Sequence, residues 1–224
     1  MDFKSLINEV LIRLREDTLS TTLGSSANIF TDPLVSDYQR LVASLINDSK
    51  RNVESYHDWL VLRETVNITT ASGTRNYSLS SGQEVKVVDV INQSTGNKLV
   101  QVSRQYINST LYPSENSGEP LYYAFNGADS SNNLKVDLEP KPNTVQTISF
   151  DIVKQQSNLT LANDNMKVPE QAVILGAWMR AISERGEDGG SQASVVAQEF
   201  KESINQAIIK DSGNTQYETE WVAT

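Results

Sequence analysis

The chain has a single histidine, His57, which stands directly before Asp58 in the sequence. A histidine steered by a carboxylate can act as a general base. However, successive residues on a helix point about 100° apart, so these two side chains do not form a dyad. We therefore interpret His57 as a polar residue at the edge of a helix.

Paired carboxylates are the second group with catalytic chemistry, because a glycoside hydrolase needs two of them across a cleft. Five acids lie in or beside predicted strands, and any pair of them could be chosen: Glu84, Asp89, Asp137, Glu139 and Asp151. We interpret them as solvating the strand surfaces. The sequence from Asn163 to Glu170 lacks the glycine and the final glutamate of a calcium loop, and the glycines within 186–190 lack the Lys-Ser/Thr of a phosphate loop. We therefore expect no enzymatic activity, no cofactor and no metal site.

Two groups of aromatic residues carry more information. Trp59 precedes three apolar residues, and we expect a helix-to-sheet hinge here, formed by Tyr56, Trp59, Leu60 and Leu62. Tyr217 and Trp221 stand on a short acidic terminal segment with no apolar pattern of its own. Because aromatic residues often anchor interfaces, we expect this second pair to dock on another protein or subunit.

The hinge residues end a long predicted helix, Ser36–Leu62. Apolar residues recur in it at helical spacing and form one stripe: Tyr38, Leu41, Val42, Leu45, Val53, Tyr56 and Leu60. Ser36 is a suitable N-cap. At about 1.5 Å per residue, this helix would be roughly 40 Å long.

Three further helices and a β-rich middle are predicted. The helices run over Asp2–Glu16, from Pro169 to Gly186, and over Ser191–Lys210. Seven short segments of β-branched and alternating residues, separated by turn sequences, are 64–70, 75–80, 83–93, 98–103, 120–127, 133–140 and 145–154. Residues 103–112 form either a short helix or an irregular segment.

This order of elements predicts an α+β fold in which an antiparallel helical bundle from both chain ends carries an inserted antiparallel β-lobe, either a small barrel or a meander. We expect residues 1–62 and 155–213 to form the discontinuous bundle and 63–154 the β-domain. Residues 214–224 would form a C-terminal arm.

The composition limits the classes of partner. The net charge is −9 and the pI is near 4.7, which argues against a surface that grips DNA or RNA, because that affinity depends on Lys and Arg. There are no cysteines, so the fold has no disulfides. No apolar run is long enough to span a membrane and the N-terminus lacks a signal-peptide profile, so we expect a soluble intracellular protein without a membrane partner.

The segment from Tyr56 to Ser80 has a DWL sequence at the end of the long helix, followed by a strand and the turn sequence SGTRNYSLS at 72–80. This pattern resembles the head-to-tail adaptor proteins of short-tailed bacteriophages, also called tail tubular protein A or tail accessory proteins. The resemblance lies in residues 36–80, and it extends to the layout of terminal helices around a β-lobe.

The resemblance implies a structural protein of the virion tail or neck, assembled in the host cytoplasm. Twelve copies would form a ring that joins the portal protein to the distal tail (nozzle) protein, with tail fibres as further partners, and DNA would pass through the lumen without sequence-specific binding. Tyr217 and Trp221 would then dock on the portal or on a neighbouring subunit. The alternative is a carbohydrate- or receptor-binding β-module of a phage tail, which the tyrosine-rich β-segment favours and the four helices disfavour.

Overall fold

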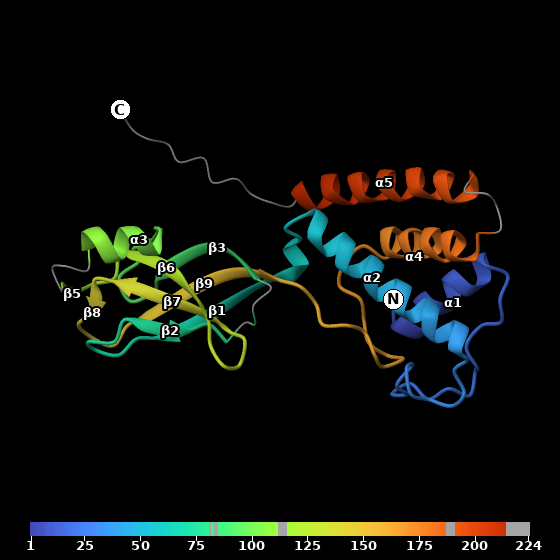
Figure 1. Cartoon of the computed structure of the whole chain (residues 1–224), viewed down its shortest axis with the longest axis horizontal. Helices are drawn as coiled ribbons and strands as arrows, with labels where there is room; N and C mark the ends of the chain where they lie inside the picture. The colour runs from blue at the N-terminus through green and yellow to red at the C-terminus, as the bar shows by residue number, and fades with distance from the viewer. Residues whose placement is uncertain (81, 83–84, 112–115, 187–190, 214–224) are drawn as a thin grey trace. The chain divides into compact units, whose positions relative to one another are not determined.

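The computed structural model describes residues 1–80, 82, 85–111, 116–186 and 191–213. The chain divides into two compact units (Figure 1). The helical unit consists of residues 1–62 and the described residues from 156 onward, and the β unit consists of residues 63–155. The chain therefore leaves the helical unit at Leu62 and returns to it at Gln156. The mixed α+β class predicted from the sequence is confirmed.

The helical unit contains the four predicted helices, α1 (Phe3–Arg13), α2 (Asp37–Tyr56), α4 (Glu170–Arg185) and α5 (Ser191–Ser212). Helix α4 is the central one, since it packs against each of the other three. The expected caps form: the Asp2 side chain accepts from the backbone N–H of Ser5, and Ser36 forms a capping box with Gln39. Gly186 ends α4 in the left-handed conformation, with φ at 65°.

The predicted length of the second helix is wrong. Helix α2 ends at Tyr56 rather than Leu62, so it has 20 residues and is roughly 30 Å long. His57 is already extended, and a short 3-10 turn, η1 (Leu60–Leu62), precedes the first strand. The cause is Trp59, whose indole N–H donates to the carbonyl of Val53 at 2.8 Å. In a longer helix that carbonyl would accept from residue 57 instead.

Gly176 allows α4 to approach α2 and α5 closely. A Cβ at this position would lie 2.3 Å from Ser49 Oγ and 2.9 Å from a ring carbon of Phe200. The hydroxyl of Ser49 also donates to the Val173 carbonyl at 2.9 Å, which ties α2 to α4 at the same level. The absence of a side chain at Gly176 is therefore a packing requirement of the helical unit.

We expect Gly176→Ala to lower the free energy of unfolding of the helical unit by about 1–3 kcal/mol, because overpacking outweighs the better helix propensity of alanine. Urea unfolding followed by tryptophan fluorescence measures this unit, since Trp59, Trp178 and Trp221 all lie outside residues 63–155. Gly24→Ala is the matched control, because a Cβ there meets nothing within 4 Å. Equal midpoints for the two variants would contradict the packing argument.

The β unit contains most of the predicted strands. Their bounds are β1 (Arg63–Thr69), β2 (Asn76–Ser78), β3 (Val85–Asn92), β4 (Val100–Gln101), β5 (Ser117–Gly118), β6 (Tyr122–Ala128), β7 (Leu134–Glu139), β8 (Lys141–Pro142) and β9 (Thr147–Lys154). The two-residue strands β5 and β8 have no counterpart in the sequence prediction. Residues 104–111 are helical, as α3 (Arg104–Tyr106) and one π turn, η2 (Ile107–Leu111), so the helical alternative for 103–112 is correct.

The described strands form three sheets, in the orders β1-β9-β3, β2-β7-β6-β4 and β5-β8, and these sheets do not close into a barrel. Long pairs such as β1 with β9 and β6 with β7 are antiparallel, as expected. The short pairs β4 with β6 and β5 with β8 are parallel. Strand β9 lies at the centre of its sheet and pairs with two strands from much earlier in the chain.

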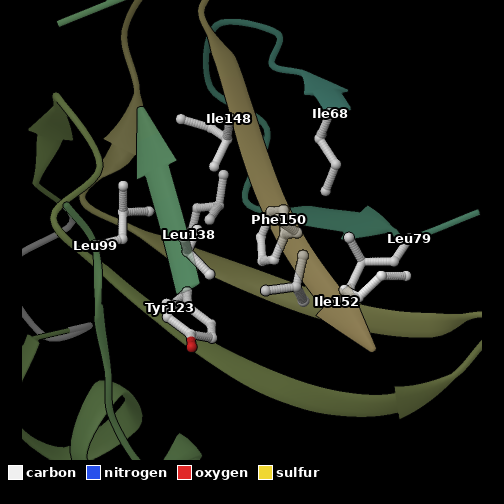
Figure 2. Packing of buried hydrophobic residues seen from close by; sticks show 10 residues of the cluster. Ile68, Leu79, Leu99, Tyr123, Leu138, Ile148, Phe150 and Ile152 are labelled. Carbon is white, nitrogen blue, oxygen red and sulfur yellow. The ribbon is translucent and has the colours of Figure 1, made fainter. Parts of the chain in front are cut away.

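One apolar cluster fills the β unit between the first two sheets (Figure 2). On β9, the alternating residues Ile148, Phe150 and Ile152 point into it, as expected for a strand with one buried face. From the other sheet, the Tyr123 ring meets the Phe150 ring edge-on, with centroids 5.8 Å apart. The other members are Ile68, Leu79, Val90, Leu99, Val136 and Leu138. The β unit therefore has its own hydrophobic core.

Candidate functional site

The four predicted hinge residues lie where the last turn of α2 gives way to β1 (Arg63–Thr69). Trp59 and Leu62 are buried, and Leu60 begins the 3-10 turn. Tyr56 differs, since it is 57% exposed and its ring meets Phe200 of α5 edge-on with centroids 6.3 Å apart. A hinge motion at these residues stays a prediction.

His57 has a carboxylate partner that sequence spacing could not reveal. Its Nε2 lies 3.0 Å from Oδ2 of Asp211, near the end of α5. The same Asp211 oxygen accepts the backbone N–H of Leu60 at 3.2 Å. The His57 ring also packs edge-on against Trp59, with centroids 5.1 Å apart. Asp211 therefore fastens α5 to the segment that joins α2 to β1.

We expect Asp211→Ala to lower the free energy of unfolding of the helical unit by about 1–2 kcal/mol, because two hydrogen bonds to one carboxylate are lost. Asp211→Asn keeps an acceptor for Leu60 and should cost less. Urea unfolding followed by tryptophan fluorescence compares the two variants. An unshifted midpoint for Asp211→Ala would show that this carboxylate does not fasten α5.

A groove of about 610 Å³ runs beside this fastening. Its lining combines the buried side chains of Trp59, Met166 and Val168 with exposed Lys167 and Lys210. Lys210 and Asp211, near the end of α5, belong to its lining. An open groove of mixed polarity fits contact with another polypeptide better than the enclosed, largely apolar cavity of a small-molecule site.

A buried ion pair on α2 escaped the sequence analysis. Lys50 Nζ lies 3.1 Å from Glu54 Oε1, and both side chains are completely buried. Lys50 also donates to the Gln156 carbonyl at 2.5 Å, while the Gln156 N–H donates to Glu54 at 3.2 Å. The pair therefore holds both backbone groups of the residue at which the chain returns from the β unit.

Burial dominates the electrostatics of this pair. It lowers the pKa of Lys50, against the opposing effect of Glu54, and it raises the pKa of Glu54, against the opposing effect of Lys50. Glu54 Oε2 has no hydrogen-bond partner within the described part of the chain. Each charge is therefore tolerated only because the other is present.

Polar side chains extend this buried face of α2. The Asn47 amide donates to the Leu159 carbonyl at 3.0 Å and accepts from the Leu159 N–H at 2.9 Å. The predicted apolar stripe omitted these positions, because it was drawn from apolar residues alone. Their spacing could have revealed them, because Ala43, Asn47, Lys50 and Glu54 are separated by three or four residues and therefore lie on one face of the helix.

The predicted docking residues Tyr217 and Trp221 lie outside the described residues. Among the residues that are described, no group of three or more His, Asp or Glu side chains could hold a metal ion. In the same part of the chain, no helix has the length and apolar character needed to cross a bilayer.

A family model described as SU10 adaptor protein matches residues 1–220, which includes both units and most of the C-terminal segment. No protein in a curated set matches the chain.

Proposed function

The chain belongs to the SU10 adaptor protein family, a family of phage head-to-tail adaptors, and we propose that it forms a ring that joins the portal to the distal tail and lets DNA pass. An adaptor of this family is a structural protein of the virion tail or neck that associates with portal and tail components. The predicted resemblance to head-to-tail adaptors is therefore confirmed. The ring, its twelve copies and the nozzle and fibre contacts are parts of the proposal.

The observation that carries the proposal is the family match over both units. The division of the chain supports it, because a helical unit built from both chain ends and a separate β unit offer two distinct surfaces for two partners. We assign the ring wall to the helical unit and the contact with the next tail component to the β unit. Closed rings use heterologous contacts, through which each copy can bury surface against two neighbours.

The proposed DNA passage rests on charge. The chain carries 28 acidic against 19 basic residues. An acidic lumen would repel the phosphates of the genome and keep it mobile, whereas a basic lumen would hold it. DNA would therefore pass without sequence-specific contact.

We propose that Tyr217 and Trp221 anchor the C-terminal arm, residues 214–224, on the portal or on a neighbouring subunit. Truncation after Gly213 should then reduce attachment to purified portal rings at least tenfold, because two aromatic anchors are lost. Cosedimentation of protein with portal measures this. The full-length Tyr217→Ala/Trp221→Ala variant shows how much of the loss is due to the two aromatic side chains and how much to the rest of the arm. Full attachment of the truncated protein would contradict the docking role.

The alternative, a carbohydrate- or receptor-binding β-module, predicts a different behaviour. The β unit is rich in tyrosine, with Tyr106, Tyr122 and Tyr123 among its residues. However, Tyr123 is 95% buried in the core of this unit, so its ring cannot stack on a sugar. Retention of the protein on glycan columns, without attachment to portal, would favour the alternative.

A further inference from the structure

A pocket rich in arginine lies at the end of α1 in the helical unit. Its volume is about 310 Å³, and its lining includes Arg13, Arg15, Trp178, Arg185 and Gln192. The Arg185 side chain is already engaged, since it pairs with Glu16 and its Nε donates to the Tyr38 hydroxyl at 2.8 Å. The pocket is a concentration of positive charge in an acidic protein.

Two guanidinium groups of this pocket are available to a ligand. Arg13 lies over the Trp178 ring, with Cζ 5.5 Å from the ring centroid, which orients the side chain without neutralising it. Arg15 is exposed. Within the described part of the chain, neither of the two has an acidic partner. Guanidinium groups of this kind favour carboxylates, which they can bind through two hydrogen bonds.

Arg15 follows the C-cap residue of α1, a position at which glycine stabilises a helix most. Its φ is 59°, and the end of α1 forms a Schellman motif in which Arg15 N–H bonds the Ile12 carbonyl and Glu16 N–H bonds the Leu11 carbonyl, both at 3.0 Å. Glycine is strongly preferred there because the left-handed conformation is unfavourable for residues with a Cβ. An arginine in this left-handed conformation is less stable than a glycine would be, which indicates that its side chain has a function.

An acidic surface suited to this pocket lies on the same unit. Along one side of α5, exposed Val195, Glu199, Glu202, Gln206 and Ile209 recur at helical spacing. Val195 and Ile209 are 59% and 71% exposed, and Ile12, next to the pocket arginines, is 58% exposed. The two surfaces therefore share the mixture of apolar and charged groups that is typical of protein interfaces.

Most other carboxylates of this unit already have partners. Glu16 pairs with Arg185, Asp37 with Arg40, and Asp211 with His57. Glu199 and Glu202 lie one turn apart on α5 and face solvent, and Glu202 accepts a hydrogen bond from the Gln198 amide at 2.9 Å. These two carboxylates therefore match Arg13 and Arg15 in number and carry the opposite charge.

We propose that the pocket of Arg13 and Arg15 binds Glu199 and Glu202 of a neighbouring copy of this chain. Residues 1–62 and 156–213 carry 17 acidic against 11 basic residues. Two copies of this unit would therefore repel each other unless a basic site on one copy meets an acidic surface on the other. This inference rests on the proposed ring, because it names the contact between its copies.

Zero-length cross-linking tests the contact directly. The R13K/R15K variant keeps both charges and supplies amines, which a carbodiimide joins to carboxylates in contact with them. In an equimolar mixture of isotopically heavy and light copies, assembled on portal rings and also alone at high concentration, heavy–light cross-links should connect positions 13 or 15 with 199 or 202. Cross-links to portal alone, or only within one copy, would overturn the inference.

Charge exchange provides the second test. R13E/R15E and E199K/E202K should each weaken association between copies at least tenfold, and the variant that combines all four changes should restore it, because every copy then carries both reversed surfaces. Lys201→Glu, a reversal elsewhere on α5, is the matched control. Arg15→Gly should weaken association while raising the unfolding midpoint, which separates binding from folding.

The tests of the contact and of the function can fail independently. If wild-type protein does not attach to portal, the proposed function is contradicted, whereas the cross-links formed by the protein alone still decide the contact. If wild-type and combined variants attach to portal equally and the two single-surface reversals do so as well, the contact between copies is overturned and the adaptor function stands.

Discussion

Lys50→Met should lower the free energy of unfolding of the helical unit by about 3–5 kcal/mol. The substitution leaves the Glu54 carboxylate without its charge partner in a site where both side chains are completely buried. It also removes the donor that holds the Gln156 carbonyl. Urea unfolding followed by tryptophan fluorescence measures the loss, because Trp59 and Trp178 belong to this unit.

The double variant Lys50→Met/Glu54→Leu is the matched control. It replaces both charges with apolar groups of similar volume and should regain most of the stability, because neither desolvation penalty remains. If the double variant were as unstable as the single variant, the backbone bonds to Gln156 would be more important than the charge pair.

The Lys50→Met variant should also show a characteristic dependence on pH. Burial already raises the pKa of Glu54 above its ordinary 4.5, and the substitution removes Lys50, which opposes this shift. Between the unfolded and the folded pKa the native state then binds more protons than the unfolded state, so stability falls as pH rises. The cost of the substitution should be smallest near pH 4 and should grow toward neutrality.

Phe150→Ala should lower the free energy of unfolding of the β unit by about 3–5 kcal/mol. The Phe150 side chain is completely buried at the centre of the core cluster and meets the Tyr123 ring edge-on (Figure 2). Its removal leaves a cavity in the core between the two sheets. Phe150→Leu keeps part of the volume and should cost less.

The two units can be followed separately in this experiment. The β unit contains no tryptophan, so its unfolding is measured by hydrogen exchange of β9 amides, while fluorescence reports the helical unit. Phe150→Ala should accelerate exchange at Ile148 and Ile152 and leave the fluorescence midpoint nearly unchanged. An equal loss in both signals would show that the units unfold together and do not have independent cores.

Local signals in the sequence predicted most elements of the fold. Capping residues such as Asp2 and Ser36 located helix starts correctly, because their side chains bond the first free N–H groups. The end of α2 was missed, because the tertiary contact between the Trp59 indole and the Val53 carbonyl overrides a pattern that still looks helical. The short strands β5 and β8 were missed because two residues carry no periodicity.

The candidate site was less accessible to sequence reasoning. The junction residues around Trp59 could be located, since a change from helical to alternating spacing is a local signal. The partner of His57 could not, because Asp211 lies 154 positions away in the chain. The pair of Lys50 and Glu54 has ordinary i, i+4 spacing, which on most helices marks a solvated surface. Only tertiary packing distinguishes this pair from an exposed one.

The adaptor function is tested most directly by the mass of portal rings that have been mixed with an excess of this protein. We predict particles heavier than free portal by a whole number of copies, equal to the number of portal subunits, with no partly filled particles at saturation. Portal rings whose mass stays unchanged at a concentration of protein well above that of the rings would contradict the account.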